Sequence, residues 1–365
     1  MDRAIAAWGI EVDTDQALRT ALNGKLKVAY TQYGYMLLLS QNAFDSPDWH
    51  IIRRICSQSD LDKLYEHIGR HLKVTHIAIN KPIPAINTND HEENVLRAPS
   101  NFTPVYGDFG PSSCSSPPTQ QDFDAAFWVT AKQNNVLQTW APRWTMFSRG
   151  NISEKARLLT LPSVQEAVDK GVADGRGCAA MDLYSGVGYF AFSYLKAGID
   201  KVLCWDLNPW SIEGLKKGAL TNKWPFVAYE GNDDDLDAME ESQRRLYIFN
   251  ESNELAPERI ERLRDELPPV RHVNCGLLPT SQAGWQISVK VLDPHLGGWV
   301  HVHENFAVEE IEQKSEEVRS AFQNMVKVEG ECGLVNLEYV HCLKSYAPGV
   351  MHCVLDIHIP PHKSG

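Results

Sequence analysis

The sequence predicts an α/β protein whose main domain is a doubly wound parallel sheet. The segment from Met181 to Trp210 has the pattern of a buried strand, a glycine turn, a helix and a second strand that ends at an acid. Strand-like and helix-like runs then alternate over residues 150–360, which is typical of parallel strands joined by helices. A chain of 365 residues is longer than one average domain, so we also expect a smaller module.

The smaller module is predicted at residues 1–80. Its expected elements are a helix that starts at Asp13 or Thr14 and ends near Leu22, a strand at 25–39, helices at 49–56 and 60–72, and a strand at 74–79. Residues 81–140 are interpreted as a linker and a small β-rich subdomain. Pro, Asn and Ser dominate this segment up to residue 121, and strand-like runs at 125–131 and 136–140 then flank the turn-forming residues 133–135.

Residues 141–365 form the predicted main domain. Beyond the segment described first, its expected elements are helices at 211–220 and 281–292 and strands at 227–229, 270–278, 299–303, 333–341 and 352–358. Residues 233–269 are interpreted as an acidic insertion at the rim of the sheet, with helix-like stretches at 236–246 and 257–267. Since 13 of the 47 acidic residues but only 5 of the 35 basic ones lie at 227–270, the net charge of −12 does not exclude RNA binding elsewhere.

The cysteines, the apolar runs and the histidines indicate which compartment, membrane association and metal content to expect. The eight cysteines include no C-x-x-C pair, and several lie in apparent strands, which indicates a reducing, cytoplasmic compartment. No apolar run approaches the roughly 18 residues of a membrane span, so no membrane partner is expected. His301 and His303 share one face of a strand, but no further ligands stand at a recognised spacing, so no metal site is predicted.

The glycine turn predicts a site for an adenosine-containing cofactor. Gly186 and Gly188 allow a ligand to approach the backbone, and Asp206 follows about 20 residues later, where an acid suits the two hydroxyls of a ribose. The spacing alone does not exclude NAD. Asp182 before the turn and the Asn-Pro after Asp206 favour the pattern of S-adenosylmethionine-dependent transferases. Tyr184, at the end of the first strand, is included among the expected cofactor contacts.

Two further segments offer candidate cofactor contacts. The run from Trp144 to Arg157 leads into a helix, and Ser148 and Lys155 could bind the amino-acid end of the cofactor through a hydroxyl and an ammonium. An ordinary helix start is the alternative. Asn232 and Asp233 follow the third strand and could bind the adenine edge, or could simply form a turn.

The run GLLPTS, residues 276–281, ends the fourth strand of the unit, where ligands bind in open α/β sheets. We expect backbone groups around Leu277 and Pro279 to face the reacting centre. The leucines before Pro279 offer no side-chain acid or base, so no catalytic residue is predicted. Arg143, Trp144 and Arg149 lie near this predicted site in the sequence and are candidate substrate contacts through cationic and aromatic groups.

Six motifs in fixed order resemble one family. FSRGNISEK, DLYSGVGYF, DLNPW, EGND, GLLPTSQAGW and GGWVHVHENF are similar to the tRNA wybutosine-synthesis protein 2 family in its fungal form, over about residues 125–360. The resemblance implies a class I S-adenosylmethionine-dependent transferase (Rossmann-like) fold. It also implies transfer of the 3-amino-3-carboxypropyl group to carbon 7 of 4-demethylwyosine at position 37 of tRNA-Phe, with release of 5′-methylthioadenosine.

The resemblance also assigns residues. Ser148, Lys155, Asp206, Asn232 and Asp233 align with the family's cofactor contacts. The sequence departs from the family at two places: Asp206 stands where the family usually has Glu, and Gly-Asn-Asp stands where it usually has Gly-Asp-Asn. Three alternatives stay open: the related tRNA guanine-37 N1-methyltransferases, a non-catalytic RNA-binding protein of the same fold, and a small-molecule methyltransferase. The oligomeric state is not predicted.

Overall fold

The computed structural model describes residues 1–12, 16–23, 26–79, 94, 96, 98–99, 102–229, 243–329 and 333–362. The chain divides into two compact units. The first unit comprises Met1–Ala131 and Thr139–Phe147, and the second comprises Lys132–Gln138 and Ser148–Gly365. This division passes through a β-hairpin, whereas the sequence suggested borders near residues 80 and 140.

The first unit is a four-stranded sheet with helices. Its strands, in the order β1-β2-β3-β4, are β1 (Tyr30–Tyr33), β2 (Met36–Leu39), β3 (His76–Ile79) and β4 (Thr103–Tyr106). Its helices are α1 (Asp2–Val12), α2 (Gln16–Leu22), α3 (Pro47–Ile55), α4 (Gln58–Leu72) and α5 (Gln120–Ala125). The single strand expected at 25–39 is a hairpin, because the backbone turns at Gly34 with a φ of 50°. Strand β4 and helix α5 lie in the segment that the sequence suggested as linker.

Buried aromatic residues and capped helices define this unit. Trp8 and Trp49 are almost fully buried, and the Trp8 indole N–H donates to the carbonyl of Asp60 at 2.7 Å. Helix α4 begins with a capping box, in which Ser57 and Asp60 each bond the other's backbone N–H. Trp8 and Trp49 belong to a hydrophobic core within the first unit.

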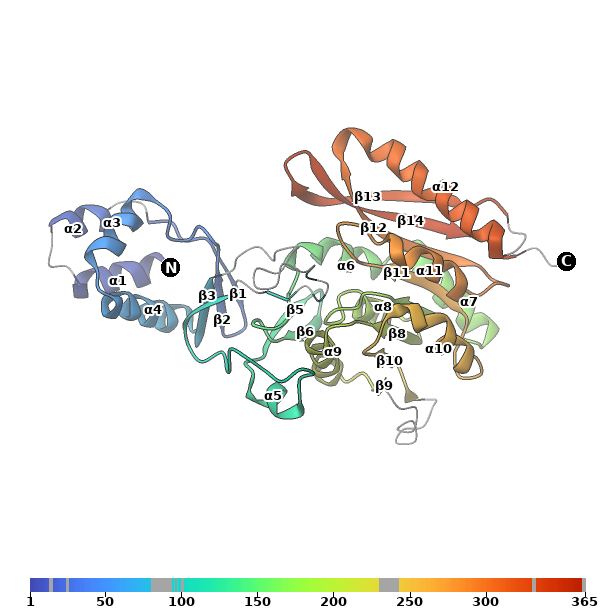
Figure 1. Cartoon of the computed structure of the whole chain (residues 1–365), viewed down its shortest axis with the longest axis horizontal. Coiled ribbons are helices and arrows are strands. Elements are labelled where there is room, and N and C mark those ends of the chain that lie inside the picture. Colours follow the sequence, from blue (N-terminus) through green and yellow to red (C-terminus); the bar gives the residue numbers. More distant parts are fainter. Residues whose placement is uncertain are drawn as a thin grey trace. The chain divides into compact units, whose positions relative to one another are not determined.

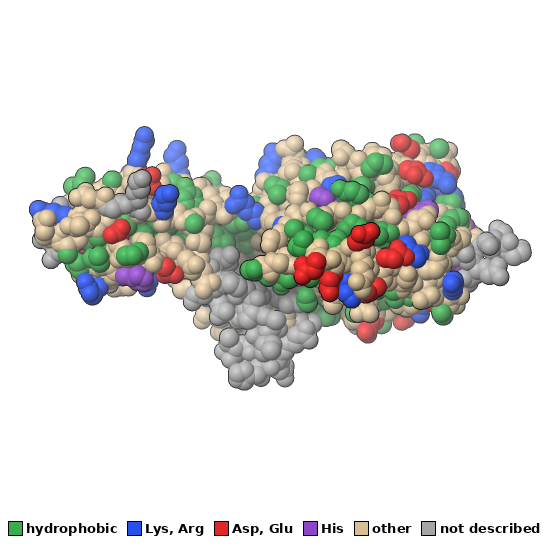
Figure 2. Space-filling model, turned by 90° about the horizontal axis from the view of Figure 1, so that it is seen from above, with side chains coloured by type: hydrophobic (Ala, Val, Ile, Leu, Met, Phe, Trp, Pro, Cys, Tyr) green, Lys and Arg blue, Asp and Glu red, His purple; other side chains and the backbone are tan. Residues whose placement is uncertain are grey.

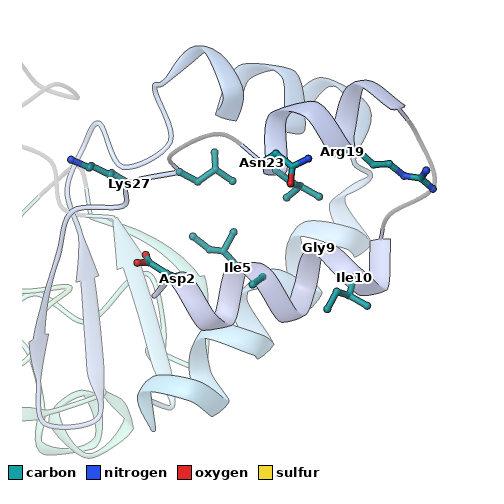
Figure 3. A pocket seen from close by; sticks show the side chains of 10 residues that line it. Asp2, Ile5, Gly9, Ile10, Arg19, Asn23 and Lys27 are labelled. Carbon is teal, nitrogen blue, oxygen red and sulfur yellow. The ribbon is translucent and has the colours of Figure 1, made fainter.

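Helices α1 and α2 and the segment at 26–27 line a pocket of about 780 Å³ (Figure 3). Its lining combines apolar side chains such as Ile5 and Ile10 with the amide of Asn23. Gly9 lets the two helices approach, since a Cβ there would lie 3.1 Å from Leu22.

The second unit contains an eight-stranded sheet in the order β13-β14-β12-β11-β7-β8-β10-β9. Its strands are β7 (Ala179–Asp182), β8 (Lys201–Trp205), β9 (Phe226–Tyr229), β10 (Leu246–Phe249), β11 (Val270–Cys275), β12 (Gly298–Ala307), β13 (Asn336–Ala347) and β14 (Val350–Ile359). The six strands from β12 to β9 are parallel, while β14 and β13 add to this edge in antiparallel orientation. The predicted doubly wound parallel sheet is confirmed, with an antiparallel pair at one edge.

Helices cover both faces of this sheet (Figure 1). One face packs against α6 (Ile152–Leu158), α7 (Pro162–Asp174), α8 (Ala191–Ala197) and α9 (Pro209–Asn222). The other face packs against α10 (Ala256–Arg262), α11 (Trp285–Val291) and α12 (Ile311–Glu329). No described helix has both the length and the apolar composition that a membrane crossing requires. The hairpin of β5 (Val129–Gln133) and β6 (Val136–Trp140) is divided between the units, with Lys132–Gln138 in this one.

Three features differ from the sequence-based expectation. The predicted helix at 236–246 is wrong where the structure describes it, because Leu246 begins β10, which lies inside the sheet between β8 and β9. Part of the span read as a rim insertion therefore belongs to the core. Helix α12 was not predicted, although Val318 and Phe322 bury one of its faces. Strand β12 is longer than expected and runs to Ala307.

Candidate functional site

The glycine turn after β7 lies at the carboxyl ends of the parallel strands. Gly186 and Gly188 have φ values of 53° and 85°, which side chains other than glycine rarely adopt. The Gly188 N–H donates to the carbonyl of Ser185 at 2.9 Å, and the Ser185 N–H donates to the carbonyl of Trp205 at the end of β8. The turn is thus fastened to the second strand of the predicted cofactor unit.

Asp206 contacts this turn directly. One carboxylate oxygen accepts the Gly186 N–H at 2.9 Å, and the other accepts the Asn208 N–H at 2.8 Å. Burial raises the pKa of Asp206 to about 6 despite these two hydrogen bonds. The structure therefore brings together the glycine turn and the acid that the sequence suggested for a ribose.

Asp182, at the end of β7, accepts hydrogen bonds next to the glycine turn. It is fully buried and accepts the Ala191 N–H at the start of α8 and the side-chain amide of Asn274, each at 3.2 Å. Burial raises its pKa to about 7. Tyr184 is half-buried beside α11, where its hydroxyl oxygen would lie 3.1 Å from a Cβ at Gly284. Direct contact of Asp182 or Tyr184 with a cofactor stays a prediction.

Lys155 and Ser148 lie beside the same turn. The Lys155 ammonium donates to the side-chain oxygens of Gln133 at 2.9 Å and Gln138 at 2.7 Å, and it stands 4.9 Å from the ring centre of Tyr189. Burial lowers the pKa of Lys155 to about 7. The Ser148 N–H donates to the Tyr189 hydroxyl at 3.1 Å.

Gln138 joins Lys155 to the glycine turn. Its side-chain amide donates to the carbonyl of Gly188 at 2.9 Å while its oxygen accepts from Lys155. Sequence reasoning missed Gln133, Gln138 and Tyr189. Gln138 lies in the predicted strand at 136–140, whereas Gln133, expected in the turn, ends the first strand of the hairpin in the structure; both are buried.

The turn after β11 is anchored to the end of β12. Glu304 accepts hydrogen bonds from the Ser281 N–H at 2.8 Å and the Thr280 hydroxyl at 2.9 Å. The Asn305 N–H donates to the carbonyl of Pro279 at 3.1 Å. Leu277 is half-buried and Pro279 is exposed, so the GLLP turn has an accessible side at the carboxyl edge of the sheet.

A buried cluster of charges fixes helix α6, which carries Lys155. Arg157 donates to Glu154 on its own helix and to both oxygens of Asp356 on β14, at 2.6 and 2.9 Å. His301 Nδ1 lies 2.7 Å from the same carboxylate. Burial alone would raise the pKa of Asp356, but the hydrogen bonds from His301 and Arg157 hold that pKa well below its usual range.

The remaining predicted residues do not take part in the contacts described above. Asn232 and Asp233 lie outside the described residues. Arg143 and Trp144 belong to the first unit, and Arg149 is exposed in the short turn before α6. Their contacts with a substrate stay predictions. Among the residues that the structure describes, no group of three or more His, Cys, Asp or Glu could hold a metal ion.

Similar solved structures define the class of fold. P. horikoshii TYW2 in complex with MeSAdo has a TM-score of 0.62 at 15% identity, with 99% of each chain covered. The complex of aTrm5 with tRNALeu has a TM-score of 0.54 at 15% identity, covering 92% of this chain and 72% of that one. The sheet order and the glycine turn are therefore those of class I S-adenosylmethionine-dependent transferases.

Sequence relatives define the family within this class. The tRNA wybutosine-synthesizing protein 2 of Schizosaccharomyces pombe is 38% identical over 327 residues, which are 89% of this chain and 71% of the relative. Its namesake in Saccharomyces cerevisiae is 32% identical over 313 residues, covering 78% of this chain and 60% of the relative. No family model matches. The chain belongs to the tRNA wybutosine-synthesizing protein 2 family and is an enzyme of tRNA modification.

Proposed function

We propose that this enzyme transfers the 3-amino-3-carboxypropyl group of S-adenosylmethionine to carbon 7 of 4-demethylwyosine at position 37 of tRNA-Phe. The by-product is 5′-methylthioadenosine. Membership of the wybutosine family carries this proposal, because that family acts on tRNA. The MeSAdo held by the archaeal TYW2 structure is consistent with an adenosine-containing ligand at this fold.

The described residues fit such a donor. The glycine turn has no side chain where a ligand would approach, and a Cβ at Gly188 would come within 2.7 Å of Phe192. Each oxygen of Asp206 already accepts one backbone N–H and keeps a further lone pair for a ribose hydroxyl. The Lys155 ammonium donates to the side-chain oxygens of Gln133 and Gln138, and an ammonium at this place suits the donor's carboxylate.

The choice of transferred group depends on placement. A sulfonium activates all three of its carbons, so a nucleophile held in line with the carbon–sulfur bond of the aminocarboxypropyl arm selects that arm. Lys155 and Ser148 hold the arm, and the GLLP turn faces the incoming base. A nucleophile held at the methyl group would instead give methylation, the reaction of the guanine-37 N1-methyltransferases.

The tRNA contacts are proposed on chemistry alone. Arg143, Trp144 and Arg149 offer cationic and aromatic groups to a base that has left the anticodon stack. Figure 2 shows Lys and Arg side chains scattered among acidic and apolar ones on the face in view, so charge does not assign a tRNA surface there. Cytoplasmic localisation is likewise a proposal.

The test uses S-adenosylmethionine labelled in its carboxyl group and tRNA-Phe that carries 4-demethylwyosine. Label in the tRNA together with methylthioadenosine supports the proposal. S-adenosylhomocysteine without label in the tRNA would establish methylation instead, and neither product would indicate a non-catalytic protein. A Lys155→Met variant, prepared in the same way, controls for a contaminating transferase.

A further inference from the structure

Two buried histidines form a pair near the carboxyl end of β12. His303 Nδ1 on β12 and His352 Nε2 on β14 lie 3.0 Å apart, and each residue is only 1% exposed. The outer nitrogens, His303 Nε2 and His352 Nδ1, have no hydrogen-bond partner within the described part of the chain. Buried polar atoms without partners are rare in native proteins, so this pair needs an explanation beyond packing.

The pair stands next to both turns of the site. The His303 ring lies 4.9 Å from the ring of Phe190, the residue that ends the glycine turn. The same Phe190 ring is 3.4 Å from where a Cβ would stand at Gly276, the first residue of the GLLP turn. Two residues beyond His303, the Asn305 N–H donates to the carbonyl of Pro279. His303 is thus one ring away from each turn that bounds the proposed reacting centre.

Both imidazoles are held neutral. Burial, then the neighbouring His352, His301 and Arg157, lower the pKa of His303 well below its usual value. Burial, followed by Lys344 and His341, lowers the pKa of His352 to about 4. Asp356 raises the pKa of His303, but by less than burial and the other groups lower it.

The number of protons on two neutral imidazoles determines whether each outer nitrogen is a donor or an acceptor. A neutral imidazole carries one N–H, so one proton of the pair lies in the bond between the rings and the other on an outer nitrogen. When His303 Nδ1 donates to His352, His303 Nε2 is a bare acceptor and His352 Nδ1 is an N–H donor. A proton accepted at His303 Nε2 can therefore be shared with the second ring, as the His303 Nδ1–H moves to His352 Nε2.

We propose that His303, backed by His352, accepts the proton that carbon 7 loses during aminocarboxypropyl transfer. This inference rests on the proposed function. Carbon 7 forms a bond to the arm while the carbon–sulfur bond breaks, and its electron pair returns to sulfur, which becomes a neutral thioether. The ring is then cationic and carries both the old hydrogen and the new carbon. Its C–H proton passes to His303 Nε2, and the C–H electrons restore the aromatic ring.

A weakly basic imidazole is sufficient for this step. A C–H bond on a cationic, dearomatised ring is strongly acidic, so the acceptor must be neutral and in place rather than strongly basic. His341 on β13 contributes electrostatically to the lowered pKa of His352 and keeps 24% of its side chain exposed. His341 Nε2 lies 3.7 Å from the Glu154 carboxylate.

The experiment compares wild type with His303→Gln, His352→Gln and His295→Gln in the full chain. His295 is exposed in the loop after α11 and serves as the matched control. Single-turnover rates are measured at saturating donor with tRNA-Phe whose 4-demethylwyosine carries either hydrogen or deuterium at carbon 7. Donor affinity is measured by calorimetry, and folding is checked by thermal unfolding. If His303→Gln does not fold, His352→Gln probes the same relay from its far end.

We expect His303→Gln to slow the transfer by about 10²-fold, the usual contribution of a positioned acid or base. A deuterium isotope effect, small in wild type where bond formation limits the rate, becomes large in this variant because proton loss now limits it. His352→Gln gives a smaller change of the same kind, while donor affinity and the His295→Gln control are unchanged.

Two results would overturn the inference. The first is a His303→Gln rate within a factor of about three of wild type, without an isotope effect. The second is a loss of folding or donor affinity that accounts for the whole rate change, again without an isotope effect, which marks a purely structural pair. A wild-type protein that yields no labelled tRNA would refute the proposed function itself, which separates the two failures.

Discussion

Asp356→Asn removes one charge from the buried cluster that fixes helix α6. Asp356 is 4% exposed and accepts two hydrogen bonds from Arg157, while His301 lies 2.7 Å away. Removing one partner of a buried ion pair costs about 3–5 kcal/mol. Since Glu154 still pairs with Arg157, we expect the lower end, about 3 kcal/mol of lost unfolding free energy at neutral pH.

The pH dependence has a definite sign. The folded-state pKa of Asp356 is depressed below its ordinary value of 3.8, so its ionised form stabilises the fold. That stabilisation is fully present above the ordinary pKa and is lost as the pH falls toward the lower folded-state pKa. The difference between wild type and Asp356→Asn is therefore constant near neutrality and narrows only in acid.

Urea unfolding followed by tryptophan fluorescence measures this difference. Asp174→Asn is the matched control, because Asp174 forms an exposed pair with Arg176 at 3.0 Å and such pairs contribute about 0–1 kcal/mol. Donor affinity is measured on the same samples, and we expect it to fall in Asp356→Asn because α6 carries Lys155. An Asp356→Asn protein that loses less than about 1 kcal/mol would show that the cluster does not hold the helix.

The remaining predictions concern the cofactor site. Gly188→Ala should abolish donor binding in calorimetry, because φ is 85° and the new Cβ would lie 2.7 Å from Phe192; unchanged affinity would contradict the assigned turn. Lys155→Met should weaken donor binding at least tenfold, about 1.4 kcal/mol, while leaving adenosine binding intact; equal loss for both ligands would remove Lys155 from the carboxylate. Donor affinity should fall as the pH drops below about 6, since protonated Asp206 is a poorer acceptor, and an Asp206→Asn variant should lack that dependence.

The cofactor unit was predictable because its determinants are local. Gly186 and Asp206 are 20 residues apart, and the strand, turn and helix between them follow from short-range pattern and glycine chemistry. Strand β10 was missed because it has only four residues, and they follow a polar segment of acids and then Arg244 and Arg245 that resembles a solvated helix. Only the neighbours β8 and β9 decide that this short segment is a central strand.

The supporting contacts of the site were beyond sequence reasoning. Arg157 and Asp356 are 199 residues apart along the chain, and His303 and His352 are 49 apart. Neither spacing belongs to a motif, since the fold of the antiparallel edge alone places β14 beside β12. Lys155 was predicted as a cofactor contact, and this role stays a prediction. Its partners Gln133 and Gln138 come from a hairpin that pattern alone assigned to another domain.

The division of the chain within that hairpin affects how the enzyme can be taken apart. Residues 132–138 belong to the second unit, which holds the eight-stranded sheet. The two strands of the hairpin, β5 and β6, begin and end in the first unit. A fragment that begins at Ser148 would retain the whole eight-stranded sheet yet leave the Lys155 ammonium without Gln133 and Gln138. A fragment that keeps these two contacts of Lys155 therefore has to start upstream of the hairpin.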